Sequence, residues 1–443
     1  MTDRDAFNDD LLRFLASAPT PFHAAAEIEA RLRKAGFVPF HASAAPQPAG
    51  PGVFLRQGGS VIALKPGQAP LEEEGLRMVG AHTDSPCLMV KPRPEQTSAG
   101  YRQLGVEVYG GALLNPWFDR DLSLAGRVSF AAPGGGVATA LVDFECPIAV
   151  IPSLAIHLDR EANKNRSVNA QTQMAPLLAL ASLGDSDGDW DLRQALTERL
   201  RAAGETLDEV LDYELCFYDT QPPAIIGLRG EFIASARLDN LLSCYTGMAA
   251  LLAGGGARPW SLLVCNDHEE VGSLSASGAQ GPMLRHFLQS LSPTPLPVLM
   301  QSSMMISADN AHGVHPNFKD RHDPSHGPML NGGPVIKVNA SQRYASSSDG
   351  AALFRLLASR LDLPVQSFAM RADMACGSTI GPLTAGEIGV TTLDVGVPTF
   401  AMHSIRELAG SDDAWTLCRI LRTYFAEPAP LFAAGAGSQD PHS

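Results

Sequence analysis

Five imidazole and carboxylate side chains stand where the sequence pattern ends a strand or begins a helix. They are His82, Asp239, Glu270, Asp309 and His403. Imidazole and carboxylate ligands without thiolate suit zinc, cobalt or manganese. Two such cations that share a carboxylate can activate a water and polarise a carbonyl, so these residue types favour hydrolytic chemistry.

Three of the five residues, His82, Glu270 and Asp309, each follow an apolar run that predicts a buried strand. In an open α/β sheet, ligand groups collect beyond the carboxyl ends of the strands. The sequence therefore predicts that these three side chains lie at one edge of a sheet. The predicted strands are 77–81, 262–264 and 304–306.

Helices and strands alternate in both terminal parts of the chain, which predicts an α/β sheet with helices on both faces. Thr20 and Pro21 are suited to begin a helix that ends at Gly36. Other expected strands are 53–55, 61–64, 365–370 and 391–395, and other expected helices are 239–252, 349–361 and 411–425.

The middle of the chain has a different texture, with short β-rich pieces and the glycine-rich loop 133–136. Leu192, Leu196 and Leu200 are spaced for one amphipathic helix. A chain of 443 residues also exceeds the usual size of a single core. We therefore expect an inserted β-rich domain at 92–235 and a discontinuous catalytic domain formed by 1–91 and 236–443.

The net charge of −14 and the pI near 5.3 argue against nucleic-acid binding. No apolar run is long enough for a membrane span, and the acidic N-terminus does not resemble a secretory signal, so a cytoplasmic location is expected. The seven cysteines form no CxxC pair, which predicts reduced thiols. Residues 427–443 are expected to form a flexible tail.

Several long motifs resemble the aspartyl aminopeptidase family, a branch of the two-zinc exopeptidases. Together they run through nearly the whole chain and are far more specific than an isolated HxD or EE pair. They are GAHTDSP, GGALLNPWFDRDLSLAGRV, IPSLAIHLDR, RLDN, NDHEEVGS, SADNAHGVHPN, GPVIKVNASQRYAS, CGSTIGP and AMHSIRE.

The resemblance implies a three-layer mixed-sheet zinc-exopeptidase fold with an inserted dimerisation domain. It implies two divalent metal ions, zinc or else manganese or cobalt, bridged by Asp239. One ion would also be held by His82 and Asp309, the other by Glu270 and His403. Glu269 would be the general base, and Asp239-Asn240 would be a cis peptide.

The resemblance also implies that His157 reaches a neighbouring subunit's active site and helps to hold the oxyanion. Family members commonly form tetrahedral shells of twelve subunits, so a homo-oligomer built from dimers is expected. The other interpretation of His157 is an ordinary surface histidine.

Ordinary interpretations compete with several other assignments. Asp84 is expected to accept the His82 imidazole proton that faces away from the metal, although an HxD triplet alone is usually a surface turn. Asp239 is also a suitable helix cap. Adjacent Glu269 and Glu270 alone would suggest a solvated helix start, and His403 alone a core or surface histidine.

Substrate contacts are expected from Lys337, Arg343, Tyr344 and His315. The strand period places Lys337 opposite Ile336 and Val338, which are expected to face a core, so its ammonium could read an acidic substrate side chain. A solvent-facing strand lysine is the alternative. Glycine-rich GGALLNP and CGSTIGP are interpreted as close backbone approaches near the site. For the histidines after Asp309, substrate or structural contacts are favoured over a third metal.

The leading hypothesis is therefore a metallo-aminopeptidase that removes N-terminal residues, preferably Asp or Glu. Its alternatives are a related two-metal amidohydrolase or deacylase, and a self-assembling scaffold without activity. Release of aspartate from an Asp-Ala peptide, but not from its N-acetylated form, distinguishes the first two. Metal content together with peptidase activity distinguishes the third.

Overall fold

The computed structural model describes residues 2–42, 46–181 and 190–432. Most of the expected tail at 427–443 lies outside these residues. Within them, no helix combines the length and the apolar character needed to cross a bilayer.

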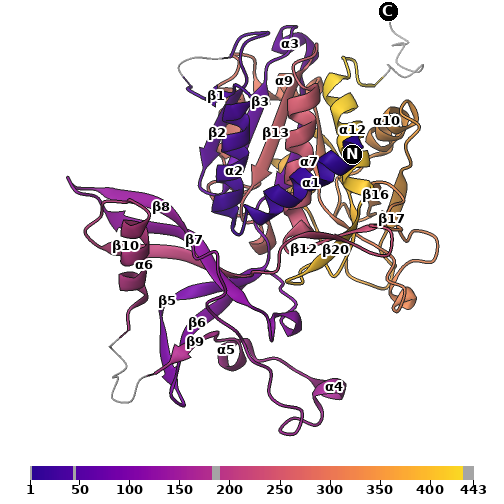
Figure 1. The fold of residues 1–443 in the computed structure, drawn as a ribbon. Coiled ribbons are helices and arrows are strands. Elements are labelled where there is room, and N and C mark those ends of the chain that lie inside the picture. The colour runs from indigo at the N-terminus through magenta and orange to yellow at the C-terminus, as the bar shows by residue number, and fades with distance from the viewer. Residues whose placement is uncertain (1, 43–45, 182–189, 433–443) are drawn as a thin grey trace, which may run out of the picture.

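The largest element is a mixed nine-stranded sheet built from residues 1–91 and 236–443, the two segments expected to form the catalytic domain, which we call the catalytic part (Figure 1). β13, β4 and β14 are neighbours in it and run parallel. The predicted strands and the 53–64 hairpin are confirmed. In sheet order the strands are β1 (Val38–Pro39), β2 (Val53–Gln57), β3 (Ser60–Lys65), β13 (Trp260–Asn266), β4 (Leu76–His82), β14 (Met304–Ala308), β18 (Thr391–Gly396), β16 (Val335–Val338) and β17 (Gln366–Ala369).

Helices cover both faces of this sheet, which makes the catalytic part three-layered, as expected. Two separate apolar cores lie between the sheet and the helices. One face is covered by α1 (Asp3–Ala16), α2 (Pro21–Lys34), α7 (Leu238–Gly254), α10 (Ser348–Ser359) and α12 (Asp413–Ala426). The other is covered by α3 (Leu71–Glu74), α8 (Met283–Gln289), α9 (Leu296–Gln301) and α11 (Ile380–Ile388).

A second, six-stranded sheet lies beside the catalytic part and has its own apolar core (Figure 1). Its strands in order are β8 (Val137–Asp143), β7 (Leu122–Ala131), β10 (Val210–Asp219), β5 (Cys87–Ser98), β6 (Tyr101–Tyr109) and β9 (Leu177–Leu180). All of them are antiparallel. We call this unit the inserted sheet.

Local sequence signals explain why the helices begin and end where they do. Thr20 caps α2, Pro21 begins it, and Gly36 follows it with φ 86°. Asp191 caps α6 (Leu192–Ala202), whose apolar face at Leu192, Leu196 and Leu200 packs into the core of the inserted sheet. These predictions are confirmed.

A protruding arm, residues 152–169, extends from the inserted sheet and contains the short helix α4 (Ala162–Asn165). Two other short helices, η1 (Asn115–Trp117) and α5 (Ala170–Gln173), lie outside the arm. Figure 1 shows α4 at the outer end of this arm. Three apolar residues of the arm, Leu154, Ile156 and Leu158, are exposed.

A third sheet of five strands joins distant parts of the chain. Its order is β11 (Ala224–Ile226), β12 (Phe232–Ser235), β20 (Glu407–Gly410), β19 (Pro398–Phe400) and β15 (Ala311–His312). Because β12 pairs with β20, residues 224–235 share a sheet with C-terminal strands, not with the inserted sheet, whose last strand ends at Asp219.

Candidate metal centre

Three neighbouring parallel strands bring His82, Glu270 and Asp309 to one edge of the large sheet. His82 is the last residue of β4, and Asp309 directly follows β14. Glu270 lies in the short helix η2 (Glu269–Val271), which follows β13. The sequence prediction that these side chains share an edge is confirmed, because all three strands point the same way.

Asp239 and His403 reach the same place from two other segments. Asp239 lies at the irregular start of α7, where Asp239-Asn240 is a cis peptide, as predicted. Asp239 and Asn240 have non-helical backbone angles, so the regular part of α7 begins only after them. His403 has φ 68° and lies in the loop between β19 and β20.

The five side chains form two groups that share Asp239. One Asp239 oxygen lies 3.4 Å from His82 Nε2, which is 3.6 Å from Asp309 Oδ1. The other lies 3.5 Å from His403 Nε2, which is 3.4 Å from Glu270 Oε2. Ligand atoms of a tetrahedral zinc with bonds of about 2.0–2.1 Å are about 3.3–3.4 Å apart. The separations therefore fit two zinc sites joined by one carboxylate.

The cluster contains buried carboxylates whose charges bound cations would neutralise. Burial and the nearby Asp239 carboxylate raise the pKa of Glu270 to about 10. Burial opposes ionisation of Asp239 as well, but the His403 and His82 imidazoles lower its pKa. Asp239 Oδ1 and Glu270 Oε1 are buried, and neither has a hydrogen-bond partner among the described residues. Divalent cations would satisfy these oxygens.

Both histidines present Nε2 to the cluster because Nδ1 is engaged elsewhere. His82 Nδ1 lies 3.0 Å from the Asp84 carbonyl oxygen and 3.4 Å from the Asp84 carboxylate. His403 Nδ1 lies 3.2 Å from the Gly111 carbonyl oxygen. An Nδ1–H that donates to a carbonyl leaves Nε2 free as a metal ligand.

The Asp84 carboxylate also makes backbone contacts that the sequence did not suggest. Its carboxylate accepts the backbone N–H groups of Glu269 at 3.1 Å and Glu270 at 3.0 Å. The main-chain carbonyl of Asp84, more than its carboxylate, orients His82, which differs from the expected contact. The carboxylate instead holds the turn that carries the two glutamates.

Burial, together with nearby Asp309, raises the pKa of Glu269 to about 7.

Glu407 is a buried residue of the site to which sequence reasoning assigned no role. One of its carboxylate oxygens accepts the Asp239 N–H at 2.8 Å, and the other accepts the His403 N–H at 2.7 Å. Burial raises the pKa of Glu407, and the negative charge of the nearby Asp239 carboxylate raises it further. Glu407 is 168 residues from Asp239 in the chain, so no local pattern indicates their contact. Its position in the AMHSIRE motif is the sequence signal that could have pointed to a role in the site.

The expected substrate residues are only partly brought together. Lys337 is 2% exposed and donates to Asp309 Oδ2 at 3.2 Å, with its ammonium 5.0 Å from the Tyr344 ring centre. It is therefore not a solvent-facing lysine. Arg343 is exposed. Val338, expected in the core, is 47% exposed, because it ends β16 beyond the pairing with β18, whereas Ile336 is buried as expected.

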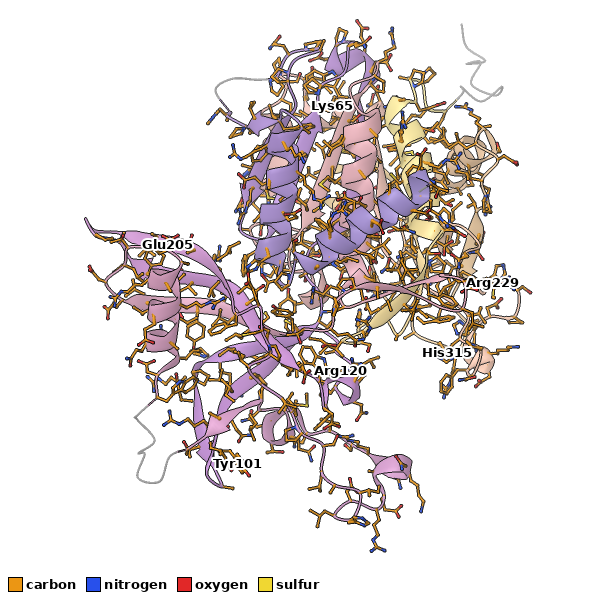
Figure 2. All side chains as sticks on the ribbon, viewed as in Figure 1. Lys65, Tyr101, Arg120, Glu205, Arg229 and His315 are labelled. Atoms are coloured by element: carbon orange, nitrogen blue, oxygen red, sulfur yellow. The ribbon has the colours of Figure 1, made fainter. Side chains whose placement is uncertain are left out.

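A cavity of about 280 Å³ is bordered by Met402, which precedes His403 in the chain, and by His312, which follows Asp309 by three residues. His315, on an outer loop of the catalytic part (Figure 2), lines it and packs on Phe400. The cavity is also lined by His312, Arg321, His322, Phe368 and Arg371.

His157 lies apart from this cluster, exposed on the protruding arm. The inserted sheet nevertheless reaches the centre through GGALLNP. A Cβ on Gly110 would lie 3.1 Å from Glu270 Cβ, and one on Gly111 would lie 3.2 Å from His403 Nδ1. The predicted close backbone approach is confirmed for this motif.

Comparison with known proteins gives consistent results. The profile of a family described as Aminopeptidase I zinc metalloprotease (M18) matches residues 14–425. The chain is 56% identical over 428 residues to a Probable M18 family aminopeptidase 2 of Pseudomonas putida (strain GB-1), covering 95% of this chain and 98% of that relative.

Two solved structures extend this similarity to the fold. A chain in the Ape4 and Nbr1 complex is 36% identical, with a TM-score of 0.90 over 96% of this chain and 86% of its own length. The mApe1 dodecamer of S. cerevisiae is 26% identical, with a TM-score of 0.81 over 95% of this chain and 96% of its own.

Proposed function

Because this chain belongs to the M18 family and is a zinc metallo-aminopeptidase, we propose that it removes N-terminal aspartate and glutamate from peptides with two zinc ions per subunit. The observation that carries the two-ion assignment is the shared carboxylate of Asp239. Each of its oxygens faces a different histidine, His82 or His403, at 3.4–3.5 Å. Manganese or cobalt would fit the same ligand types.

The ligand assignment follows these two groups. His82, Asp309 and Asp239 would hold one ion, and His403, Glu270 and Asp239 the other. When bound, two zinc ions that share a carboxylate activate a water for attack and polarise the scissile carbonyl.

Glu269 is the proton carrier of the proposed reaction. Its backbone is fixed by Asp84, while no hydrogen bond to the Glu269 carboxylate is found in the part of the chain that the structure describes. The carboxylate would take the proton of the attacking water and give it to the leaving amine. Its neighbour Glu270, which faces His403, cannot serve this purpose while it binds metal.

The acidic preference rests on the charge around the 280 Å³ cavity. Histidine and arginine side chains line it, with Asp323 as the acidic exception among its lining residues. Burial lowers the pKa of His312 and His322, so the positive charge of this lining rests mainly on Arg321 and on Arg371, which is paired with Asp373. A substrate aspartate or glutamate side chain would therefore be attracted there. Lys337, held by Asp309 on the inner side, adds positive potential.

We also propose that the protein works as a homo-oligomer in the cytoplasm. The exposed arm with Leu154, Ile156 and Leu158 offers apolar surface for a second copy, and it carries His157 away from its own metal cluster. The dodecameric state of the yeast mApe1 relative supports a twelve-subunit assembly. All seven cysteines are free thiols, which fits a reducing compartment.

The decisive experiment is a panel of dipeptides with different N-terminal residues, hydrolysed by protein reconstituted with zinc, manganese or cobalt. We expect Asp-Ala and Glu-Ala to have the highest kcat/KM and N-acetyl-Asp-Ala to be inert. Preferred cleavage of the acetylated peptide would favour an amidohydrolase. Two bound zinc ions without any hydrolysis would favour a scaffold. Equal rates for Leu-Ala and Asp-Ala would overturn the acidic preference alone.

A further inference from the structure

We propose that residues 109–113 of the inserted sheet position the metal centre, with Tyr109 as the main positioning residue. This inference rests on the proposed two-zinc centre. It gives the inserted sheet a part in the chemistry of its own subunit, separate from any role in assembly.

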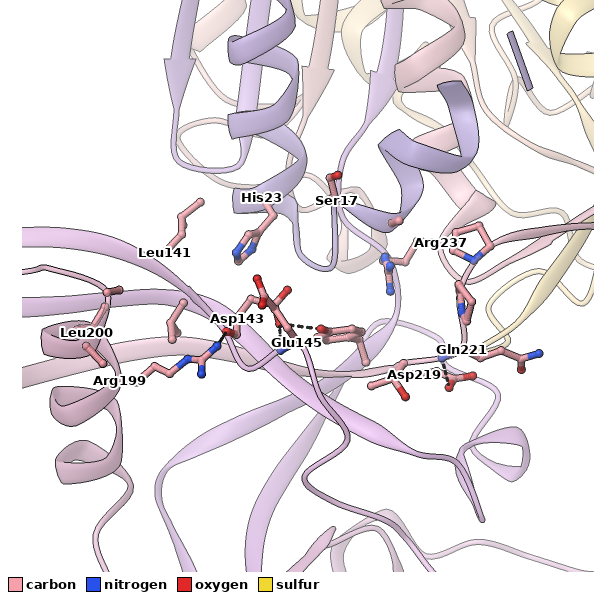
Figure 3. Close-up of a pocket in the computed structure, with 18 residues that line it drawn as sticks. Ser17, His23, Leu141, Asp143, Glu145, Arg199, Leu200, Asp219, Gln221 and Arg237 are labelled. Carbon is pink, nitrogen blue, oxygen red and sulfur yellow. Dashed lines mark hydrogen bonds between the residues drawn. The ribbon is translucent and has the colours of Figure 1, made fainter. Parts of the chain in front are cut away.

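The inserted sheet and the catalytic part do not pack together along their whole boundary. A cavity of about 820 Å³ lies between them (Figure 3). Ser17, His23 and Arg237 line it on the catalytic side, and Asp143 and Arg199 on the other. The relative position of the two parts therefore depends on the places where they do touch.

One such place is the end of β6. The Tyr109 hydroxyl donates to Asp84 Oδ2 at 2.7 Å, across the boundary between the two parts. Asp84 is 1% exposed, and the same carboxylate accepts the N–H groups of Glu269 and Glu270. Tyr109 thus holds the Asp84 carboxylate in place. That carboxylate in turn holds the turn that carries Glu269, the proposed base, and Glu270, a proposed zinc ligand.

The next residues of the segment hold His403 from two sides. The Gly111 carbonyl accepts the His403 Nδ1–H at 3.2 Å, and the Leu113 N–H donates to the His403 carbonyl at 3.0 Å. Gly110 packs against Glu270, whose Cβ would lie only 3.1 Å from a Cβ at position 110. Both His403 and Glu270 belong to the same proposed zinc site, so the direct contacts of residues 110–113 are with that site, whereas the other site is reached through Asp84 and His82.

Tyr109→Phe tests the segment with the loss of a single hydroxyl. Tyr218→Phe is the matched control, because Tyr218 in the inserted sheet makes the same 2.7 Å bond to a carboxylate, that of Asp143, away from the metal cluster. We measure zinc affinity at both sites by competition with a chromophoric chelator, together with kcat and KM for Asp-Ala. Loss of a contact behind a metal ligand lowers affinity or activity about 10–100-fold.

We expect Tyr109→Phe to weaken one zinc site by about tenfold or more and to lower kcat while KM changes little. Tyr218→Phe should keep both zinc affinities and kcat. Wild-type zinc affinity and kcat in Tyr109→Phe would overturn the proposal, as would equal losses in the two variants, which would indicate general destabilisation.

Gly111→Ala provides a second route if Tyr109→Phe does not fold. Its added methyl group pushes on the His403 ring, whereas Gly386→Ala, the control, adds a methyl group that meets nothing within 4 Å. Selective weakening of one zinc site in Gly111→Ala supports the proposal, and unchanged affinity overturns it. If the wild-type protein binds fewer than two zinc ions, the proposed two-zinc function is wrong. If the wild-type protein binds two but the variants bind them equally well, only the positioning role of residues 109–113 is wrong.

Discussion

Glu269 and Glu270 are neighbours in the chain, yet their contacts differ. Glu270 faces His403 at 3.4 Å, within the ligand cluster. The Glu269 side chain is held by no hydrogen bond among the described residues, although Asp84 fixes its backbone. A fixed backbone with a free carboxylate suits a group that moves protons.

Replacement of Glu269 with Gln should therefore remove the proton carrier without removing a ligand. We expect kcat to fall by about 10²–10⁴-fold. Zinc content, measured by atomic absorption, should stay at the wild-type value. Glu205→Gln, at an exposed position, is the control and should behave as wild type. A kcat within threefold of wild type in Glu269→Gln would remove Glu269 from the mechanism.

Glu407 links Asp239 to His403 by accepting the backbone N–H groups of both residues. An amide offers only one acceptor oxygen and turns its NH₂ toward the other N–H. A buried donor without a partner costs about 1–3 kcal/mol. We expect Glu407→Gln to lower zinc affinity by about tenfold or more, since 1.4 kcal/mol corresponds to a factor of ten.

The control for this prediction is Glu74→Gln. Glu74 is also buried and accepts a backbone N–H, that of Ala429, but lies far from the cluster in the fold. Its replacement should lower Tm and leave chelator competition unchanged. Equal zinc affinities in the two variants would contradict the role of Glu407.

At the scale of elements, the order β13-β4-β14 explains why three ligands could be expected at one edge. Strand identity comes from local apolar runs, and the carboxyl ends of parallel neighbours coincide. The error at Val338 has the same origin. Alternation along β16 places Ile336 and Val338 on one face, but sequence period does not reveal that the pairing with β18 ends at Ile336 and leaves Val338 at the margin of the sheet.

Helix α2 carries a pH-sensitive group in its first turn. Burial, reinforced by Arg237 and Arg56 against the opposing Asp143 charge, lowers the pKa of His23 to about 4. Its Nδ1 lies 2.8 Å from Thr20 Oγ1. The folded state keeps this imidazole neutral, while the unfolded chain protonates it near its ordinary pKa of about 6.5. The stability that His23 contributes is thus present above about pH 6.5 and is lost as pH falls toward 4.

We expect His23→Gln to flatten this part of the pH dependence. The wild-type protein should lose about 2 kcal/mol more than the variant between pH 7 and pH 5, as measured by urea unfolding of metal-free protein. His41→Gln, at an exposed histidine, should follow the wild-type curve. Parallel curves for wild type and His23→Gln would refute the assignment.

At the scale of the whole molecule, a strongly acidic chain buries several carboxylates around one point. Bound cations offset their mutual repulsion, so metal and fold should be linked. Chelation should lower Tm, and zinc at 100-fold over its Kd should restore about 2.7 kcal/mol. Magnesium should not, because it prefers oxygen ligands over imidazole. An unchanged Tm on adding zinc to metal-free protein would contradict this linkage.

The protruding arm raises a question of assembly. If His157 completes a neighbouring site, His157→Phe should lower turnover by about 10²–10³-fold, typical of a lost oxyanion donor. Zinc content and the sedimentation coefficient should stay unchanged. His326→Phe, at an exposed histidine of the catalytic part, serves as the control. Full turnover by His157→Phe in intact oligomers would exclude the arm from catalysis.

The amino-acid sequence alone determined the types of the main helices and strands and the edge where His82, Glu270 and Asp309 collect, because apolar periodicity and strand ends are local properties. Its motifs, through their family resemblance, also indicated the cis peptide and the ligand set. Only the tertiary structure decided that Glu407 joins Asp239 to His403 and that Tyr109 supports Asp84. Such contacts join residues that are far apart in the chain. Which groups a carboxylate contacts depends on how the strands and loops pack against one another, and local sequence spacing does not reveal that packing.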